Sequence, residues 1–425
     1  MKEYLEKFSA EVRELIAVLR RLAGELDYNA YLVGGCVRDL LLGMKNLDLD
    51  IVIEGDGIAF AEKLSAHLGV KVVFHRRFGT ATCFIHSHLK LDIATCRREF
   101  YPEPGHLPVV SAGLLKDDLF RRDFTINAMA ISISDPGFGR FIDLFNGRSD
   151  LNNKKIRILH NLSFVDDPTR ILRAVRFEQR YGFRLETATL SLLKKACQMA
   201  LLEKIQAQRI RDEIVLILKE DDPLKPLKRL KQLTGLGFIN KHLYFPDGKS
   251  RLLKKAASTI RHFNRLSPLR RRLEGWVVYL TALLDGLSSG EAKKVLNKFV
   301  FAKGVQRRVL SYIKESDKII RVLKKPQIKS SRVYNLLEPL SYETIILIKA
   351  KSSSSKVRKE IDCFFNLSGF MRLHISGCDL NALGIKSGPC YQEILKKVLN
   401  ARIDARVNTL DEELALASRL AKIRS

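Results

Sequence analysis

The chain has 425 residues, which predicts about three folded units at the usual ~150 residues per domain. Its 74 Lys and Arg residues outnumber its 47 Asp and Glu residues, and the formal net charge of +27 favours a polyanionic partner such as nucleic acid. A hydrophobic content of 46% excludes wholesale disorder, and no apolar run approaches the ~18 residues of a membrane span, so we expect no membrane integration.

The N-terminal segment, residues 1–26, alternates charged and apolar residues at helical spacing. It lacks the continuous apolar stretch and the small-residue cleavage site of a signal peptide, so we expect a cytoplasmic protein. The seven cysteines are odd in number and scattered, and they predict neither a disulfide framework nor a zinc site.

The first third of the chain mixes short strands with loops, and the rest is helical in pattern. Short β-branched or aromatic runs separated by Gly or polar residues predict strands at residues 31–33, 49–53, 71–74, 80–85 and 89–95. Beyond Asp150 the pattern is amphipathic, and it predicts helices such as 170–179, 190–199 and 209–218. The fold class is therefore α+β, with a small mixed head followed by an all-helical remainder.

Two features that suit phosphate chemistry lie close together in the segment YLVGGCVRDLLLGMKNLDLDIVIEG. Gly34 and Gly35 separate a predicted strand from a predicted helix, so the backbone can approach a phosphate there, and Arg38 adds a positive charge. Asp48 and Asp50 open the next strand, and a period of two places both carboxylates on one face. Because Mg²⁺ binds through one or two carboxylates plus substrate phosphates, the segment predicts phosphoryl or nucleotidyl transfer.

The same segment carries a family resemblance. GGCVRD with DLD resembles the signature of the polymerase-β nucleotidyltransferase superfamily, in the branch of class II tRNA nucleotidyltransferases and bacterial poly(A) polymerases. Three later blocks strengthen it: RRDFTINA at 121–128, DDPTRILRAVRF at 166–177 and QRIRDE at 208–213 are similar to the RRDFTxNA, EDxxRxxRAxRF and ERIxxE blocks of that family. A weaker similarity to the tail of many members lies at 376–389.

The resemblance implies a domain order. It implies a five-stranded nucleotidyltransferase head over residues 1–150, a helical neck with the nucleotide-selecting helix over 151–220, an RNA-binding helical body over 221–335 and a tRNA-binding helical tail over 336–425.

The resemblance also implies a Mg²⁺-dependent enzyme that adds CMP, AMP or both to the 3′ acceptor end of tRNA from CTP and ATP. The family pattern has Glu where this chain has Asp166, so full CCA addition, addition of only the terminal A and addition of only CC all stay open. A bacterial poly(A) polymerase is the alternative enzyme, and an inactive RNA-binding protein is the alternative of another class. The sequence does not indicate the oligomeric state.

The expected site residues come from these blocks. Asp48 and Asp50 are the predicted metal ligands and catalytic residues, and Asp92, on a neighbouring predicted strand, is a candidate third carboxylate. The expected nucleotide-binding residues are Gly34, Gly35, Arg38, Arg121, Arg122, Asp123, Asn127, Asp167, Arg170, Arg173 and Arg176.

Asp167 and Arg170 are the predicted base readers. Asp167 can cap the following helix. Arg170, Arg173, Arg176 and Arg180 share one arc of about 120°, a pattern that by itself is typical of a solvated face. A carboxylate accepts from the exocyclic amine of cytosine or adenine, and Arg donates to the adjacent ring nitrogen. Uracil and guanine carry a carbonyl in place of that amine, so the pair favours CTP and ATP.

Two further segments bear on function. Residues 100–113 contain three Pro and two Gly residues, so they cannot form a continuous helix or a central strand, and we expect a mobile loop beside the site. Residues 251–272 contain eight Lys and Arg residues and no acidic residue, which predicts contacts with the phosphates of RNA.

Overall fold

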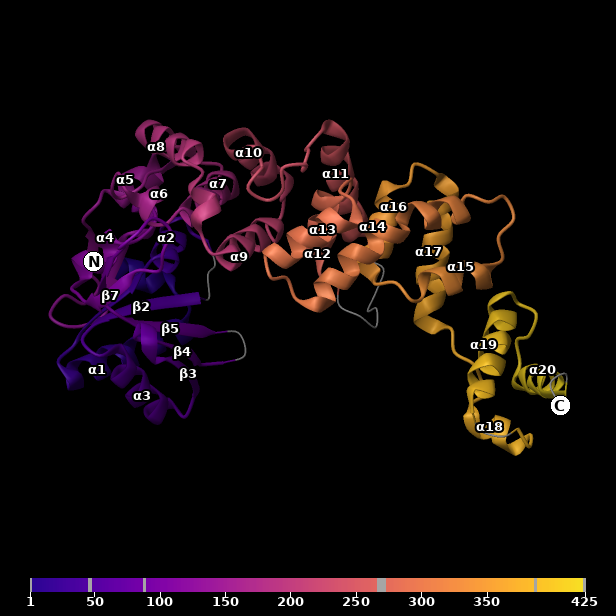
Figure 1. Ribbon diagram of the computed structural model, residues 1–425. Coiled ribbons are helices and arrows are strands. Elements are labelled where there is room, and N and C mark those ends of the chain that lie inside the picture. Colours follow the sequence, from indigo (N-terminus) through magenta and orange to yellow (C-terminus); the bar gives the residue numbers. More distant parts are fainter. Residues whose placement is uncertain (1, 45–47, 87–88, 266–272, 386–387, 423–425) are drawn as a thin grey trace. The chain divides into compact units, whose positions relative to one another are not determined.

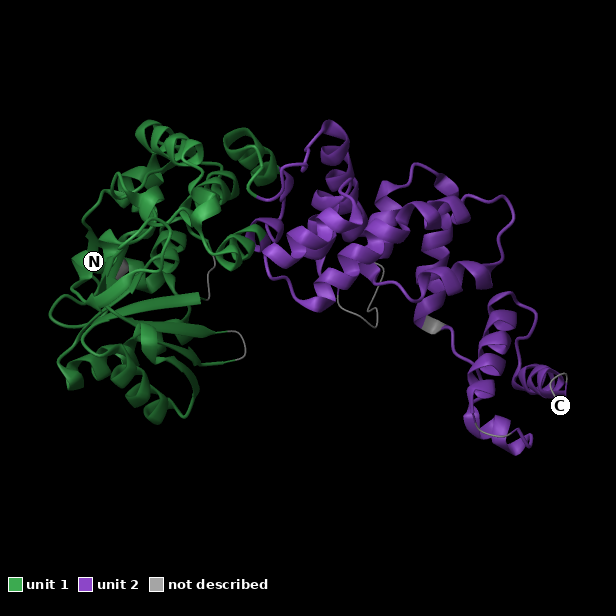
Figure 2. Ribbon diagram, in the orientation of Figure 1, with its two compact units in different colours: residues 1–214, 225–238 green, residues 215–224, 239–425 purple. Residues whose placement is uncertain are grey.

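The computed structural model describes residues 2–44, 48–86, 89–265, 273–385 and 388–422 (Figure 1). The chain forms two compact units (Figure 2). Unit 1 comprises residues 1–214 and 225–238, and unit 2 comprises residues 215–224 and 239–425. No helix in the described ranges combines the length and the apolar character that a bilayer crossing requires.

Unit 1 is built on a seven-stranded mixed sheet with the strand order β3-β4-β5-β2-β1-β8-β9. Its strands are β1 (Asn29–Val33), β2 (Asp48–Glu54), β3 (Lys71–His75), β4 (Thr80–Phe84), β5 (Lys90–Thr95), β8 (Met129–Ser132) and β9 (Phe141–Asp143). The central pair β2 and β5 is parallel, and every other neighbouring pair in this sheet is antiparallel. On β2, Leu49 and Ile51 are buried, whereas Asp48 is exposed and Asp50 is half-buried.

The predicted α+β class is confirmed, and the five predicted strands correspond to β1 through β5. The expected number of five strands in the head sheet is wrong, because β8 and β9 extend the sheet beyond β1. All four residues of β8 are buried, so the strand shows no apolar and polar alternation, and β9 is only three residues long.

Helices cover this sheet and continue beyond it. On α1 (Ala10–Leu26), a face of apolar side chains that includes Leu15, Leu19 and Leu22 is buried, and α1 packs against α3 (Gly57–Leu68). The other helices of this part of the chain are α2 (Gly35–Leu41), α4 (Leu115–Phe120), α5 (Gly147–Asn152), α6 (Ser163–Asp166), α7 (Thr169–Tyr181), α8 (Thr187–Gln198), α9 (Ala207–Leu218), α10 (Leu224–Thr234) and the 3-10 helices Lys2–Lys7, Arg76–Phe78, Thr125–Asn127 and Leu201–Lys204. A short parallel pair joins β10 (Lys155–Ile156) to β11 (Arg184–Leu185).

The proline-rich segment 100–113 begins and ends in paired backbone. β6 (Arg97–Phe100) and β7 (Val109–Ala112) form an antiparallel ribbon outside the main sheet, with Phe100 opposite Val109. The expectation of a loop across the whole segment is therefore wrong at its ends, where ladder hydrogen bonds hold the chain. Only residues 101–108 connect the two strands.

The three helices predicted after the head are confirmed as α7, α8 and α9. On α7, Ile171, Leu172 and Val175 are completely buried, so this helix is fixed in the core of unit 1 by its apolar side.

Unit 2 is all-helical in its described residues. Its helices are α11 (Asp247–Arg265), α12 (Gly275–Leu284), α13 (Ser289–Lys298), α14 (Lys303–Leu323), α15 (Ser330–Leu337), α16 (Tyr342–Lys351), α17 (Ser355–Phe370), α18 (Gly377–Ala382), α19 (Pro389–Ile403) and α20 (Leu410–Lys422). Helix α12 is buried almost all round, and α11, α14 and α16 pack against it. A smaller apolar cluster around Leu380, Ile394 and Val398 joins α18, α19 and α20. The division into neck, body and tail stays a prediction.

Candidate functional site

A cavity of about 700 Å³ in unit 1 gathers the predicted site residues. Thirteen of the fourteen line it: Gly34, Gly35, Arg38, Asp48, Asp50, Arg121, Arg122, Asp123, Asn127, Asp167, Arg170, Arg173 and Arg176. Asp92 is the exception. Nine arginines and six acidic residues line the cavity, so its charge suits a polyanion such as a nucleoside triphosphate.

Asp48 and Asp50 lie at the start of β2, and both line this cavity. The buried Leu49 lies between them in sequence. Among the residues that the structure describes, no group of three or more His, Cys, Asp or Glu side chains is arranged to hold a metal. Two carboxylates are nevertheless sufficient for Mg²⁺ when substrate phosphates supply further oxygens. The hard oxygen donors of Asp48 and Asp50 therefore fit that ion.

Asp92 is the register partner of Asp50 across the parallel β2 and β5 strands, so its position beside the pair agrees with the prediction. Its carboxylate, however, accepts a hydrogen bond of 2.6 Å from Oγ1 of Thr82 and one of 2.5 Å from Nζ of Lys90. These two contacts hold the Asp92 carboxylate outside the lining of the cavity. Its role as a third catalytic carboxylate stays a prediction.

The electrostatics of Asp50 suit a cation. Burial raises the pKa of Asp50 to about 6, the nearby carboxylates of Asp92 and Asp48 act in the same direction, and Arg122 opposes them. A divalent cation between Asp48 and Asp50 would offset both the burial and the repulsion.

Gly34, between β1 and α2, lies beside Arg122 and Asp50. Its φ of 72° lies in the left-handed region, and a methyl group at this position would lie 2.7 Å from Nη1 of Arg122 and 3.7 Å from Oδ2 of Asp50. The absence of a side chain on Gly34 therefore lets the Arg122 guanidinium lie against the backbone beside Asp50.

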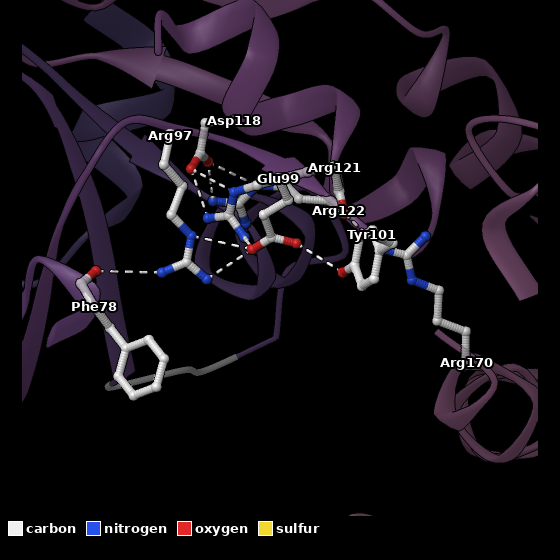
Figure 3. Close-up of polar contacts among 8 residues, drawn as sticks. All are labelled: Phe78, Arg97, Glu99, Tyr101, Asp118, Arg121, Arg122 and Arg170. Carbon is white, nitrogen blue, oxygen red and sulfur yellow. Dashed lines mark hydrogen bonds and ion pairs between the residues drawn. The ribbon is translucent and has the colours of Figure 1, made fainter. Parts of the chain in front are cut away.

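Arg121 and Arg122 share one buried counterion, Asp118 of α4, whose side chain is inaccessible to solvent. Nη2 of Arg121 lies 2.6 Å from Oδ1 of Asp118, and Nη2 of Arg122 lies 2.8 Å from Oδ2 (Figure 3). Burial raises the pKa of Asp118, but the two arginines outweigh it and lower the pKa. Both guanidinium groups are thus fixed in place at the cavity wall.

Glu99 is a second anchor for Arg121 and was not predicted. Figure 3 shows Arg97, Tyr101 and Arg121 converging on its carboxylate. Oε1 of Glu99 accepts from Nη2 of Arg97 at 2.8 Å and from Nη1 of Arg121 at 3.1 Å, and Oε2 accepts from the Tyr101 hydroxyl at 2.8 Å. Arg97 also donates to the carbonyl of Phe78. The ion pair between Glu99 and Arg121 therefore connects β6 to the C-terminal end of α4.

Arg38 is enclosed rather than extended towards the solvent. Its guanidinium donates to Oδ1 of Asp39 at 2.8 Å and to Oδ1 of Asn127 at 2.6 Å, and it lies 4.9 Å from the centre of the Tyr181 ring. Nδ2 of Asn127 in turn donates to Asp123 at 2.8 Å. A chain of hydrogen bonds therefore runs from the helix that follows the double glycine to the RRD block.

Arg170, Arg173 and Arg176 of α7 do not form a solvated face, whereas Arg180 is exposed. Arg170 and Arg176 are only 4% and 6% exposed. Arg173 lies 2.7 Å from Asp123 and 3.0 Å from Glu213, and Arg176 lies 3.5 Å from Glu213. Because the guanidinium groups of Arg173 and Arg176 are paired with carboxylates, their burial leaves no uncompensated charge.

The expected base readers lie in the same cavity but are not paired with each other. Oδ1 of Asp167 accepts from the backbone N–H and the hydroxyl of Thr169 at 3.0 and 2.6 Å, and lies 2.8 Å from Nη2 of Arg209. The capping contact of Asp167 at the start of α7 is therefore present. Arg170 donates to the Ser163 hydroxyl at 2.6 Å and to the backbone carbonyl of Arg121 at 2.6 Å.

Asp166, the departure from the family pattern, lines a different cavity of unit 1 together with His160 and Phe120. The Nδ1 atom of His160 lies 3.9 Å from its carboxylate, and burial raises the pKa of Asp166. Asp166 and Asp167 are thus neighbours in sequence that face two different environments.

Sequence reasoning missed four charged residues that hold the site: Glu99, Asp118, Arg209 and Glu213. Arg209 and Glu213 lie in the QRIRDE block, which the resemblance had already singled out, yet the sequence alone did not show which arginines or carboxylates they contact. The available signal was charge balance, because a row of buried arginines on α7 requires carboxylates from other elements.

Two family models and several curated relatives match this chain. Residues 30–157 match the family described as the poly A polymerase head domain, and residues 182–243 match the family described as the probable RNA- and SrmB-binding site of polymerase A. The A-adding tRNA nucleotidyltransferase of Geobacter sulfurreducens is 39% identical over 417 residues, 96% of this chain and 47% of that relative. The A-adding tRNA nucleotidyltransferase of Halalkalibacterium halodurans is 34% identical over 390 residues, 90% of this chain and 86% of that relative.

Solved structures are similar over the whole chain. The Thermotoga maritima CCA-adding enzyme complexed with tRNA superimposes with a TM-score of 0.75 at 34% identity, covering 99% of this chain and 98% of that one. The complex of a CCA-adding enzyme with ATP gives a TM-score of 0.78 at 34% identity, covering 99% and 97%. This chain spans about half the length of the Geobacter relative but nearly the full length of these structures.

Proposed function

The chain belongs to the family of class II tRNA nucleotidyltransferases and bacterial poly(A) polymerases, and we propose that it adds AMP from ATP to the 3′ end of tRNA without a template. The observation that carries this proposal is that one arginine-lined cavity holds both the Asp48 and Asp50 pair and the Asp167 carboxylate. The first two residues suit a divalent cation that also binds the triphosphate, and the third suits a base with an exocyclic amine.

Enzymes of this family generally use a divalent metal. We propose Mg²⁺, held by Asp48 and Asp50; when bound, it activates the attacking hydroxyl and neutralises charge on the leaving group. In the proposed reaction, O3′ of the RNA bonds to the α-phosphorus of ATP, the bond between the α- and β-phosphates breaks, and pyrophosphate leaves while the hydroxyl proton passes to solvent. Arg122, fixed by Asp118, places a positive charge beside Asp50.

Asp167 is the proposed base reader. The three contacts described for its carboxylate all use Oδ1, so Oδ2 is the oxygen that remains for the exocyclic amine of adenine. Arg209, at 2.8 Å from Oδ1, holds the orientation of the Asp167 carboxylate. Guanine and uracil present a carbonyl at that position, and two acceptors facing each other in a partly dry cavity are unfavourable.

Addition of the terminal A alone is our first choice because relatives that align with 90% or more of this chain are named A-adding. Full CCA addition is the second candidate, since the solved structures of CCA-adding enzymes cover almost the whole chain at similar identity. The matched poly A polymerase head domain keeps poly(A) tailing as the alternative that the experiment has to exclude.

tRNA is the proposed macromolecular partner, and a cytoplasmic location is part of the same proposal because tRNA is processed there. The net charge of +27 and the matched RNA-binding segment at 182–243 support it. Of the predicted basic run at 251–272, residues 251–265 belong to α11, and 266–272 lie outside the described residues.

The test uses three forms of one tRNA, lacking the whole CCA end, lacking CA, or lacking only the terminal A. Each is incubated with labelled ATP, CTP, GTP or UTP. We expect a single AMP on the tRNA that lacks only the terminal A, and no incorporation of GMP or UMP. Incorporation of CMP on the two shorter tRNAs would establish full CCA addition instead, and a long tail on unrelated RNA would establish poly(A) polymerase activity.

A further inference from the structure

A second charged cavity lies in unit 2, far along the chain from the nucleotide site. It has a volume of about 490 Å³ and is lined by Pro246, Gly248, Lys249, Arg251, Leu252, Lys255, Asp285, Gly286, Ala350 and Lys351. The lining comes from the start of α11, from the connection between α12 and α13, and from the end of α16. Helices α11, α12 and α16 pack against one another, so the cavity is built on a packed core.

The charge of this lining is strongly positive. Lys249, Arg251, Lys255 and Lys351 contribute four cations, and Asp285 contributes one carboxylate. Nζ of Lys351 lies 3.1 Å from Asp285, so these two charges balance each other. Lys351 also lies 3.2 Å from Asp317, which does not line the cavity.

Arg251 and Lys255 are exposed and lie four residues apart on α11, so their side chains project from the same face of the helix. Among the residues that the structure describes, neither side chain has a hydrogen-bond or ion-pair partner. Both charges are therefore available to a ligand in the cavity.

Lys249 occupies the floor of the cavity. Its side chain is buried, with 9% of the residue exposed, and Nζ donates to the backbone carbonyl of Leu283 at 2.7 Å. Burial lowers the pKa of Lys249 to about 8, against the opposing effect of Asp285. A buried ammonium group whose direct partner is an uncharged carbonyl is poorly compensated, and an anion in the cavity would provide the missing charge.

We propose that this cavity binds a backbone phosphate of the tRNA substrate, with Lys249 at its floor and Arg251 and Lys255 at its mouth. The proposal rests on the proposed function, because tRNA is the polyanion that the enzyme has to hold. The lining contains no aromatic side chain on which a base could stack, so the contact is with the phosphate and is independent of base sequence.

The main test is the double variant Arg251→Ala, Lys255→Ala in the full chain. Both side chains are exposed, so the fold should not change. We expect KM for tRNA to rise about tenfold, with KM for ATP and kcat within about twofold of the wild-type values, because two phosphate contacts are lost and the nucleotide cavity is unaltered. The dissociation constant for tRNA should also depend less steeply on salt concentration.

The matched control is Lys293→Ala, Lys294→Ala, which removes two exposed charges from α13 of the same unit. The control should change KM for tRNA by less than about twofold. An equal loss in both double variants would show that only the overall charge matters, and wild-type KM in the Arg251 and Lys255 variant would overturn the site.

Direct binding separates this proposal from the proposed function. If the wild-type protein binds tRNA but transfers no nucleotide, the proposed function fails while the cavity can still be tested by fluorescence anisotropy with labelled tRNA. Lys249→Met, which keeps an apolar stem but removes the ammonium group, should weaken tRNA binding in the same assay. Unchanged binding by this variant would exclude Lys249 from the site.

Discussion

Asp167, at the start of α7, is ion-paired with Arg209 of α9, and not with Arg170, which lies three residues further along its own helix. The two residues are 42 positions apart in sequence, so the pair depends on the fold that brings the start of α9 to the start of α7. This relationship makes Arg209 a positioning residue for the proposed base reader.

Replacement of Arg209 by Ala should reduce discrimination between bases. Without the guanidinium at 2.8 Å, the Asp167 carboxylate loses a charge-assisted contact that holds its orientation. We expect the ratio of kcat/KM for ATP to kcat/KM for GTP to fall about tenfold, in the range of one such contact. Arg211→Ala, on the same helix beside Asp212, is the control and should leave the ratio unchanged. A proportional loss for both nucleotides would argue that Arg209 supports only the fold.

Asp50 of β2 and Asp92 of β5 are register partners, but of the two only Asp50 lines the nucleotide cavity. Asp50→Asn should lower kcat by at least about a thousandfold, since it removes a proposed metal ligand, with tRNA affinity unchanged. Asp92→Asn should lower kcat by about tenfold or less, because the Asp92 carboxylate is held by Thr82 and Lys90. Single-turnover rates of AMP transfer measure both effects. Equal losses would instead place Asp92 among the catalytic carboxylates.

Gly34→Ala should impair catalysis more than stability. The φ of 72° combined with a ψ of −134° costs alanine about 1–3 kcal/mol, and the new methyl group would also displace the Arg122 guanidinium. Gly69→Ala is a matched control, because Gly69 has a φ of 64° but no atom within 4 Å of the added methyl group. Both variants should lose thermal stability, Gly34→Ala the more, because Gly69 has a ψ of 28° that alanine adopts more readily than the −134° of Gly34. Only Gly34→Ala should raise KM for ATP, about tenfold. Similar KM values for ATP in the two variants would show that the position of the Arg122 guanidinium does not affect nucleotide binding.

The local parts of this fold and site could be predicted from the sequence. Short β-branched runs gave the strands that alternate in burial, such as β2, and the blocks around Asp50 and Asp167 placed the cavity lining correctly. Strand β8 could not be predicted, because a strand buried on both faces has no apolar and polar alternation with a period of two.

The partners of the charged residues could not be predicted in the same way. Arg173 and Glu213 are 40 residues apart, and Arg121 and Glu99 are 22 residues apart. A period of 3.6 residues shows which arginines share a helix face, but it does not show whether that face meets solvent or a carboxylate from another element. The pattern alone therefore did not show that Arg170 and Arg176 are buried, whereas Arg180 on the same arc is exposed.

Asp123 should contribute to the pH dependence of the stability of unit 1. Burial raises its pKa, but Arg173 and Asn127 outweigh burial and lower the pKa to about 2, below the ~3.9 of an unfolded chain. The ionised form therefore stabilises the native state above pH ~4, and this contribution is lost as the pH falls from ~4 towards ~2. Asp123→Asn should lower the free energy of unfolding by about 2 kcal/mol at pH 7, and the difference from wild type should shrink below pH 4.

Hydrogen exchange of peptides from unit 1 is the appropriate measurement for this variant, because the single tryptophan, Trp276, lies in unit 2. Asp212→Asn, an exposed change on α9, is the control and should follow the wild-type profile at every pH. A difference between Asp123→Asn and wild type that stays constant from pH 7 to pH 3 would mean that the carboxylate acts through its shape and hydrogen bonds rather than its charge. In that case Arg173 would be held mainly by Glu213, at 3.0 Å, and the charge of Asp123 would matter little to the wall of the nucleotide cavity.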